Sequence, residues 1–141
     1  MYILDTNVIS EIRKAKSKKA NINVLNWASS IPVSQLFLSV ISVMELEMGV
    51  LLMERKDKNQ GAILRDWLDN HVLKTFKGKI VPIDTSVAQR CAKLHVPDPR
   101  SERDALIAAS GLLQNMTVVT RNTNDFKHTK IKLLNPWKIN G

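Results

Sequence analysis

Acidic residues stand at the junctions of expected strands, loops and helices in well-separated parts of the chain. They are Asp5, Glu45 and Asp104, with Asp125 as a further candidate. Asp5 directly follows the short apolar run of residues 2–4, and an unpaired carboxylate at the end of a buried strand is costly unless a cation or hydrogen-bond donors meet it. In open parallel α/β sheets, ligands bind at the carboxyl ends of the strands. We therefore take Asp5 as the first candidate active-site residue.

Carboxylates that converge on one point repel each other and hold raised pKa values unless a divalent cation neutralises them. Oxygen ligands without a nearby Cys or His suit Mg²⁺ or Mn²⁺ better than zinc. Such an ion can generate hydroxide from bound water and stabilise the leaving oxygen of a phosphodiester. The acidic residues thus predict metal-dependent hydrolysis, provided that the fold brings them together.

Helix capping offers a second explanation for two of these acids. Ser42 with Glu45 fits a capping box, and Asp104 also stands at the third position of an expected helix, where its charge would favour the helix dipole. Both interpretations stay open on this ground. His71, His95 and His128 have no metal-ligand spacing, and His71 and His95 are expected at a helix surface or core edge. The phosphate-loop and GxSxG patterns are absent from the sequence.

The elements that must position these residues follow from the hydrophobic pattern. Short apolar runs predict strands at residues 2–4, 36–39, 80–83, 118–120 and 131–134. Helical periodicity and capping residues predict helices that begin near residue 6 and span residues 21–30, 42–53, 59–75 and 85–94. Residues 101–104 open a further expected helix, which continues over residues 105–114. Alternating strands and helices are typical of parallel βαβ units, and Pro82 indicates an edge strand. We expect one α/β domain over residues 1–141 with a mostly parallel central sheet.

The chain has 141 residues and a formal net charge of +8, which favours a polyanionic partner such as nucleic acid. The basic run of residues 13–19 is either a solvated loop or an edge that contacts phosphate. The single Cys91 cannot form an internal disulfide, and Asp5 and Glu11 interrupt any signal-peptide pattern. No window approaches the ~20 apolar residues of a membrane span, so we expect a cytoplasmic protein with no membrane association.

Five motifs in order resemble the VapC type of PIN-domain toxin, the ribonuclease half of a bacterial toxin–antitoxin pair. They are LDTNVISE, LSVISVMELEMGV, RDALIAASGLL, TRNTNDF and LLNPW, and the resemblance covers the whole chain. It implies a three-layer α/β/α PIN-like fold, a Mg²⁺-dependent endoribonuclease (with Mn²⁺ as the alternative ion) that cleaves RNA by metal-activated water, and a cognate antitoxin.

The resemblance also implies roles for individual residues. Asp5, Glu45 and Asp104 fall on the acidic catalytic and metal-site positions of the family. Thr6 and Asn7 support Asp5.

The fourth corner of the site departs from the family pattern. Asn122 stands where many PIN proteins have Asp after the Thr-Arg of this turn, and it offers a carbonyl oxygen without a charge. Asp125 either serves the metal through a water or caps the turn.

Two helices bear on partners. The expected helix of residues 42–53 and its neighbour carry more apolar side chains than one buried face needs, so they either pack in the core or form a groove for the antitoxin. The candidate partner-binding residues are Met44, Met48, Leu52 and Trp67. We also expect a homodimer.

Two rival functions remain. A haloacid-dehalogenase-like phosphatase would use Asp5 as a covalent nucleophile, but it needs a second Asp two residues on, where this chain has Asn7. The other rival is a non-catalytic nucleic-acid-binding PIN-like module whose acidic site has decayed. Asn122 is the only residue that supports this alternative.

Overall fold

A five-stranded sheet forms the centre of the protein. The computed structural model describes residues 1–139, and its strands follow the order β3-β2-β1-β4-β5 with every neighbouring pair parallel. The strands are β1 (Tyr2–Leu4), β2 (Leu36–Ser39), β3 (Ile80–Val81), β4 (Thr117–Val119) and β5 (Leu133–Leu134). The predicted mostly parallel sheet is confirmed, and β3, which precedes Pro82, is an edge strand as expected.

Strand register decides which residues meet at the carboxyl edge of the sheet. Leu4 at the end of β1 is paired with Val119 at the end of β4. The backbone N–H of Asp5 continues this ladder and donates to the carbonyl oxygen of Val119 at 2.9 Å. Asp5 therefore leaves β1 level with the turn that follows β4.

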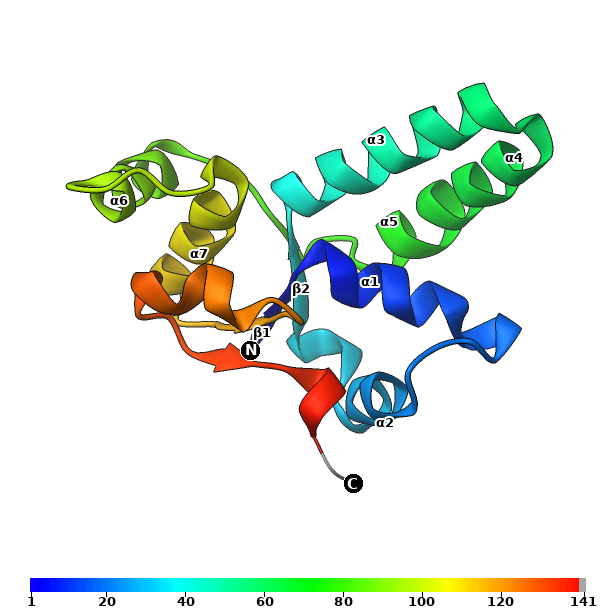
Figure 1. Cartoon of the computed structure of the whole chain (residues 1–141), viewed down its shortest axis with the longest axis horizontal. Coiled ribbons are helices and arrows are strands. Elements are labelled where there is room, and N and C mark those ends of the chain that lie inside the picture. Colours follow the sequence, from blue (N-terminus) through cyan, green and yellow to red (C-terminus); the bar gives the residue numbers. More distant parts are fainter. Residues whose placement is uncertain (140–141) are drawn as a thin grey trace.

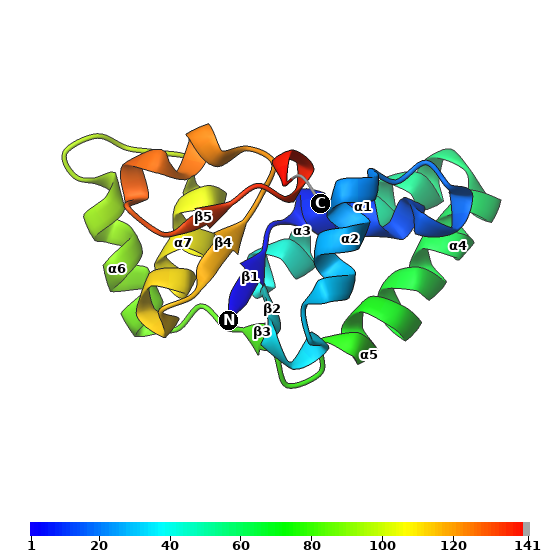
Figure 2. The same cartoon turned by 90° about the horizontal axis from the view of Figure 1, so that it is seen from below.

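Helices cover both faces of the sheet (Figures 1 and 2). Cartoons from two directions place α6 and α7 on one side and the other helices on the opposite side. The helices are α1 (Thr6–Arg13), α2 (Ile22–Ser30), α3 (Val40–Lys56), α4 (Lys58–Trp67), α5 (Leu73–Thr75), α6 (Thr85–His95) and α7 (Glu102–Gln114). The expected three-layer α/β/α architecture is confirmed.

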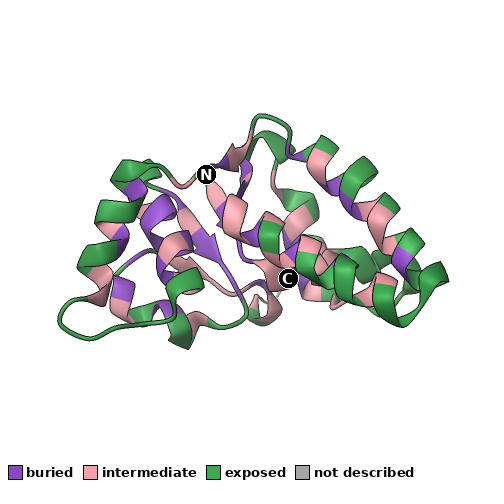
Figure 3. Cartoon of the chain, turned by 90° about the horizontal axis from the view of Figure 1, so that it is seen from above, coloured by how far each residue is buried: buried purple, intermediate pink, exposed green. Residues whose placement is uncertain are grey.

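Neighbouring residues of β1 serve the two halves of the core. Leu4 packs in a cluster with residues of α1 and α2, including Val8 and Val24. Ile3 packs in a second cluster with residues of α7 and β4, including Ile107. Side chains alternate between the two faces of a strand, so a strand that is buried on both faces contributes side chains to the core on each side of the sheet. The buried positions in Figure 3 follow the sheet and the inner faces of the helices.

The helices α3 and α4 form an antiparallel hairpin that projects from the sheet (Figure 1). The Arg65 guanidinium on α4 joins them by ion pairs to Glu47 at 2.6 Å and Glu54 at 3.2 Å on α3. Gly61 allows a close approach, because a Cβ there would lie 2.5 Å from Cα of Glu54. The helix predicted for residues 59–75 is present, but a π-helical turn, Leu68–Val72, separates α4 from α5.

The predicted capping box at Ser42 is wrong. Strand β2 runs directly into α3, so its last residue, Ser39, becomes the N-cap and its side chain accepts from the Ile41 N–H at 3.0 Å. Ser42 lies buried inside the helix. Glu45 consequently stands in the second turn of α3, away from the capping position.

The helices of the described chain are too short or too polar to cross a membrane. Within residues 1–139, no helix has both the length and the apolar character that crossing a membrane requires. Even α3, with 17 residues, has only Ser42, Leu46 and Val50 buried.

Candidate active site

Asp5 is held in a fixed orientation between β1 and α1. Its backbone is extended, and its carboxylate accepts from the Thr6 N–H at 2.8 Å and from Thr120 Oγ1 at 2.7 Å. Asn7 Nδ2 approaches the same carboxylate at 3.5 Å. Only 7% of Asp5 is exposed, and this burial raises the pKa of its carboxyl, although the hydrogen bonds from Thr120 and Thr6 oppose the rise. Thr6 and Asn7 thus both contact the Asp5 carboxylate.

Glu45 reaches the same edge of the sheet from α3. Thr6 Oγ1 donates to Glu45 Oε1 at 2.7 Å, which joins the first turn of α1 to α3. Arg103 Nη1, from the first turn of α7, lies 3.4 Å from Glu45 Oε2. The side chain of Glu45 is therefore engaged by two other helices and takes no part in a capping box.

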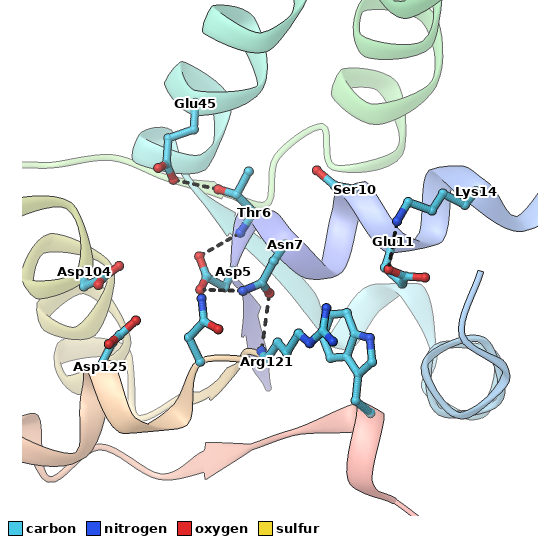
Figure 4. A pocket seen from close by; sticks show the side chains of 12 residues that line it. Asp5, Thr6, Asn7, Ser10, Glu11, Lys14, Glu45, Asp104, Arg121 and Asp125 are labelled. Carbon is cyan, nitrogen blue, oxygen red and sulfur yellow. Dashed lines mark hydrogen bonds and ion pairs between the residues drawn. The ribbon is translucent and has the colours of Figure 1, made fainter. Parts of the chain in front are cut away.

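Asp104 and Asp125 approach from the other side. Asp104 is the third residue of α7, and Asp125 lies in a 3₁₀ helix, Thr123–Thr129, which follows β4. Figure 4 shows both carboxylates beside each other and directed toward the space in front of Asp5. Burial raises the pKa of Asp104 to about 6, with further contributions from the negative charges of Asp5, Asp125 and Glu45. The carboxylates are thus close enough to influence one another.

The turn after β4 supplies the fourth corner of the site. The Asn122 N–H donates to Thr120 Oγ1 at 3.0 Å. The backbone N–H of Asp125 donates to the Asn122 carbonyl at 3.0 Å, and its carboxylate accepts no capping hydrogen bond in the described part of the chain. Asp125 therefore does not close this turn through its side chain.

A hollow of about 480 Å³ collects all five candidate ligands. Its acidic walls come from Asp5, Glu11, Glu45, Asp104 and Asp125, its cations are Lys14 and Arg121, and Asn122 and Trp137 also line it. Five carboxylates against two cations leave this hollow strongly negative. Trp137, the rim residue of the LLNPW motif, packs under the Arg121 guanidinium, 5.4 Å from the ring centroid.

The donor set of the hollow fits a hard divalent cation, because it consists of carboxylate, amide and hydroxyl oxygens with neither Cys nor His. Within residues 1–139, however, no three His, Cys, Asp or Glu side chains form a ready cage around one ion. A cation would therefore contact a subset of these carboxylates and complete its coordination with water, which is the usual behaviour of Mg²⁺.

Sequence reasoning missed Thr120 as a site residue. It follows a buried strand and opens the TRNTNDF motif, so its place at a strand end was the available signal. Three histidines of the described chain lie outside the lining of the carboxylate hollow. They are His71, His95 and His128.

The candidate partner-binding residues fall into two groups. Met44, Met48 and Leu52 lie on α3 with exposed fractions of 41%, 40% and 67%. Trp67 instead lines a hollow between α4 and the basic segment after α1, which none of these three residues lines. There the Arg13 guanidinium lies 5.8 Å from the Trp67 ring centroid. The apolar excess on α3 is thus exposed, while Trp67 belongs to a separate, partly basic groove.

Comparisons with known proteins agree with this architecture. The family model described as PIN domain matches residues 2–132. The chain is 36% identical to Toxin FitB of Neisseria gonorrhoeae, over 97% of this chain and 99% of FitB. It is 32% identical to VapC ribonuclease Y4jK of Sinorhizobium fredii, over 98% of this chain and 99% of that protein. The crystal structure of FitAcB from Neisseria gonorrhoeae superposes with a TM-score of 0.90 at 32% identity, over 99% of this chain and all of that chain.

Proposed function

The chain belongs to the PIN-domain family, and on this basis we propose that it is the toxin of a toxin–antitoxin pair and acts as an endoribonuclease. Two relatives that match it over nearly their whole length support this assignment, one named a toxin and the other a VapC ribonuclease. The observation that carries the catalytic part is the convergence of carboxylates from four separate segments on one hollow.

In the proposed enzyme, Asp5 and Asp104 would hold Mg²⁺ or Mn²⁺, with help from Glu45 and from Asn122 or Asp125. Such an ion would lower the pKa of a bound water and neutralise part of the negative charge of the phosphodiester. The strongly negative hollow supports this assignment, because an RNA phosphate would otherwise be repelled from it.

The protein's own side chains orient the reactants. Thr6 and Thr120 fix the carboxylate of Asp5 by hydrogen bonds from the N–H and the hydroxyl, respectively. Glu45, held by the Thr6 hydroxyl, stays at the rim of the hollow, where a carboxylate can orient a water or accept its proton. Lys14 and Arg121 are the cations of the same hollow that can contact a phosphate oxygen.

The rival functions lose their support. Asn7 does not replace a catalytic Asp, because its amide is engaged with Asp5 and Thr120. A decayed acidic site would have lost its carboxylates, whereas Asp5, Glu45 and Asp104 all line the hollow. The family match also disfavours the phosphatase.

The partner in the proposed pair is an antitoxin segment that covers the exposed apolar side chains of α3. Met48 and Leu52 are the centre of this surface, and neighbouring Leu51 is 50% exposed. Apolar surface of this kind typically marks protein–protein contact. The chain is also proposed to form a homodimer.

RNA cleavage tests the enzymatic proposal. The purified chain is incubated with structured RNA in Mg²⁺, in Mn²⁺ and in chelator, beside Asp5→Asn and Asp104→Asn. We expect cleavage only with a divalent ion and strong loss in both variants, while Asp66→Asn, an exposed acid on α4, cleaves normally. Full cleavage in chelator, or by both site variants, would refute the assignment.

A further inference from the structure

Two smaller hollows continue the carboxylate hollow toward the far end of α6. The first, of about 240 Å³, shares Asp104 and Asp125 with it and is also lined by Arg100 and His128. The second, of about 420 Å³, shares Arg100 and His128 with the first and adds Lys93, Asp98 and Lys130 among its lining residues. Because the two smaller hollows share lining residues, we treat them together as one surface, which we call the α6 groove.

The α6 groove lies between two segments that are distant in sequence. One is the loop that joins α6 to α7, and the other is the end of the 3₁₀ helix Thr123–Thr129. The two segments run beside each other in Figure 2. The N–H of Arg100 donates to Nδ1 of His95 at 3.0 Å, which ties this loop to the C-terminal end of α6.

The part of the α6 groove that lies beyond Asp104 and Asp125 has a net positive charge, opposite to that of the carboxylate hollow. Beyond the shared Asp104 and Asp125, its walls carry three cations, Lys93, Arg100 and Lys130, against the single carboxylate of Asp98. Among the ion pairs of residues 1–139, none involves these three cations. All three side chains are exposed, so their charges are available to a ligand.

The charges of the carboxylate hollow and of the α6 groove together indicate what the groove binds. A polyanion gains little affinity from the carboxylate hollow itself, where acids outnumber cations even after one divalent ion binds. Besides Lys14 and Arg121 inside the hollow, further cations beside it are therefore needed to contact the phosphates, since phosphate contacts supply most of the sequence-independent affinity for nucleic acid. The α6 groove places such cations in direct continuation of Asp104 and Asp125.

We propose that the α6 groove binds the backbone phosphates of the RNA strand on one side of the scissile bond, through Arg100 and Lys130 with Lys93 at its far end. This inference rests on the proposed ribonuclease function and assigns part of its substrate-binding surface. Arg100 and Lys130 are positioning residues, because they hold the strand and take no part in the reaction.

The test compares charge-matched double variants. Arg100→Gln/Lys130→Gln removes two cations from the groove, and Gln retains a long polar side chain at the left-handed backbone position of Lys130. Arg55→Gln/Lys58→Gln removes the same charge from exposed positions at the tip of the α3–α4 hairpin, at the opposite end of the molecule (Figure 1). Both pairs carry Asp5→Asn in the binding assay, so that RNA stays intact.

Binding of a short fluorescein-labelled single-stranded RNA is measured by anisotropy over a range of salt concentrations. Each lost phosphate contact should reduce the magnitude of the negative slope of log K against log salt by about 0.7. We expect this decrease for each groove residue and a near-normal slope for the hairpin control. Asp98→Asn, which removes the opposing charge, should tighten binding.

Kinetics with the wild-type site separate this inference from the proposed function. The groove variant should raise KM for RNA and leave kcat close to that of the hairpin control. If the wild type, the groove variant and the hairpin control cleave RNA with equal KM and show equal salt slopes, the proposed role of the α6 groove is refuted and the ribonuclease assignment stands. If no protein cleaves RNA, the proposed function fails. Groove variants that lose binding to a poly-glutamate peptide but not to RNA would assign the groove to an acidic protein segment.

Discussion

The Thr120 hydroxyl donates a hydrogen bond of 2.7 Å to the Asp5 carboxylate, although 115 positions separate these residues in the sequence. The same oxygen accepts from Asn7 Nδ2 at 3.4 Å and from the Asn122 N–H at 3.0 Å. One donor and two acceptor sites are the full capacity of a hydroxyl. Thr120 therefore connects β1, α1 and the turn after β4 at the centre of the candidate site.

Thr120→Val should destabilise the protein by about 1–3 kcal/mol, because it leaves the buried Asp5 carboxylate without this donor and two amide donors without an acceptor. It should also raise the pKa of Asp5 further, since the Thr120 hydrogen bond now lowers it. Thr120→Ser keeps the hydroxyl and serves as the control. Urea denaturation measures the difference, and equal stability of the Val and Ser variants would contradict this role.

The metal-free protein should lose stability as the pH rises toward neutrality, because of Asp104. Its pKa is raised from 3.8 to about 6 in the folded state. Between these values the folded state holds more protons than the unfolded state, so stability falls as the pH increases through this window. In chelator, the Tm of Asp104→Asn should exceed that of the wild type at neutral pH. The two Tm values should match near pH 3.8, the lower limit of this window.

Divalent ions provide the second arm of this measurement. Mg²⁺ should restore the wild-type Tm at neutral pH, since a bound cation favours the ionised carboxylate, and should affect Asp104→Asn much less. A wild-type Tm that rises from acidic to neutral pH in chelator, relative to the variant, would show that the carboxylates do not repel as inferred.

Asn122→Asp should lower the Mg²⁺ concentration for half-maximal RNA cleavage, because it adds a negative charge at the rim of the hollow and permits a charge-assisted contact. Asn122→Ala should raise this midpoint. Turnover can move in the opposite direction, since another carboxylate also repels the substrate phosphate. If only Asp125→Ala shifts the midpoint, Asp125 completes the site and Asn122 does not.

Met48→Asp should weaken both the complex with the antitoxin and self-association, because it places a charge in the exposed apolar surface of α3. The domain should stay folded, since Met48 is 40% exposed. Size-exclusion chromatography and titration with the purified antitoxin measure these effects. Unchanged binding, with loss in Arg13 or Lys16 variants instead, would place the antitoxin in the groove beside Trp67.

Two glycines of the α3–α4 hairpin should respond to alanine with opposite signs. A Cβ at Gly61 would meet backbone and side-chain atoms of Glu54 at 2.5–2.9 Å, so Gly61→Ala must push the helices apart and should cost about 1–3 kcal/mol. At Gly49 nothing lies within 4 Å of the added Cβ. Gly49→Ala should therefore stabilise α3 by up to about 1 kcal/mol. Similar denaturation midpoints for the two variants would contradict the close packing at Gly61.

Local patterns in the sequence determined the order of the elements and the position of Asp5. Short apolar runs alternating with helical periodicity predicted the parallel sheet, because each pattern reflects the burial of a single strand or helix face. The apolar run before Asp5 placed this carboxylate at a strand end for the same reason. The end of β2 was harder to predict, since a strand that continues into a helix has no loop residues to mark the boundary, and the capping box was placed at Ser42 although Ser39 caps α3.

Only the tertiary structure decided how the site is assembled. The contact between Thr6 and Glu45 spans 39 positions, and that between Asp5 and Thr120 depends on the pairing of β1 with β4. The α6 groove likewise joins Arg100 to Lys130 through the packing of two loops. Local propensity carries no information on such contacts, because strand order and register set the distances between segments, and these are fixed by burial of the whole core.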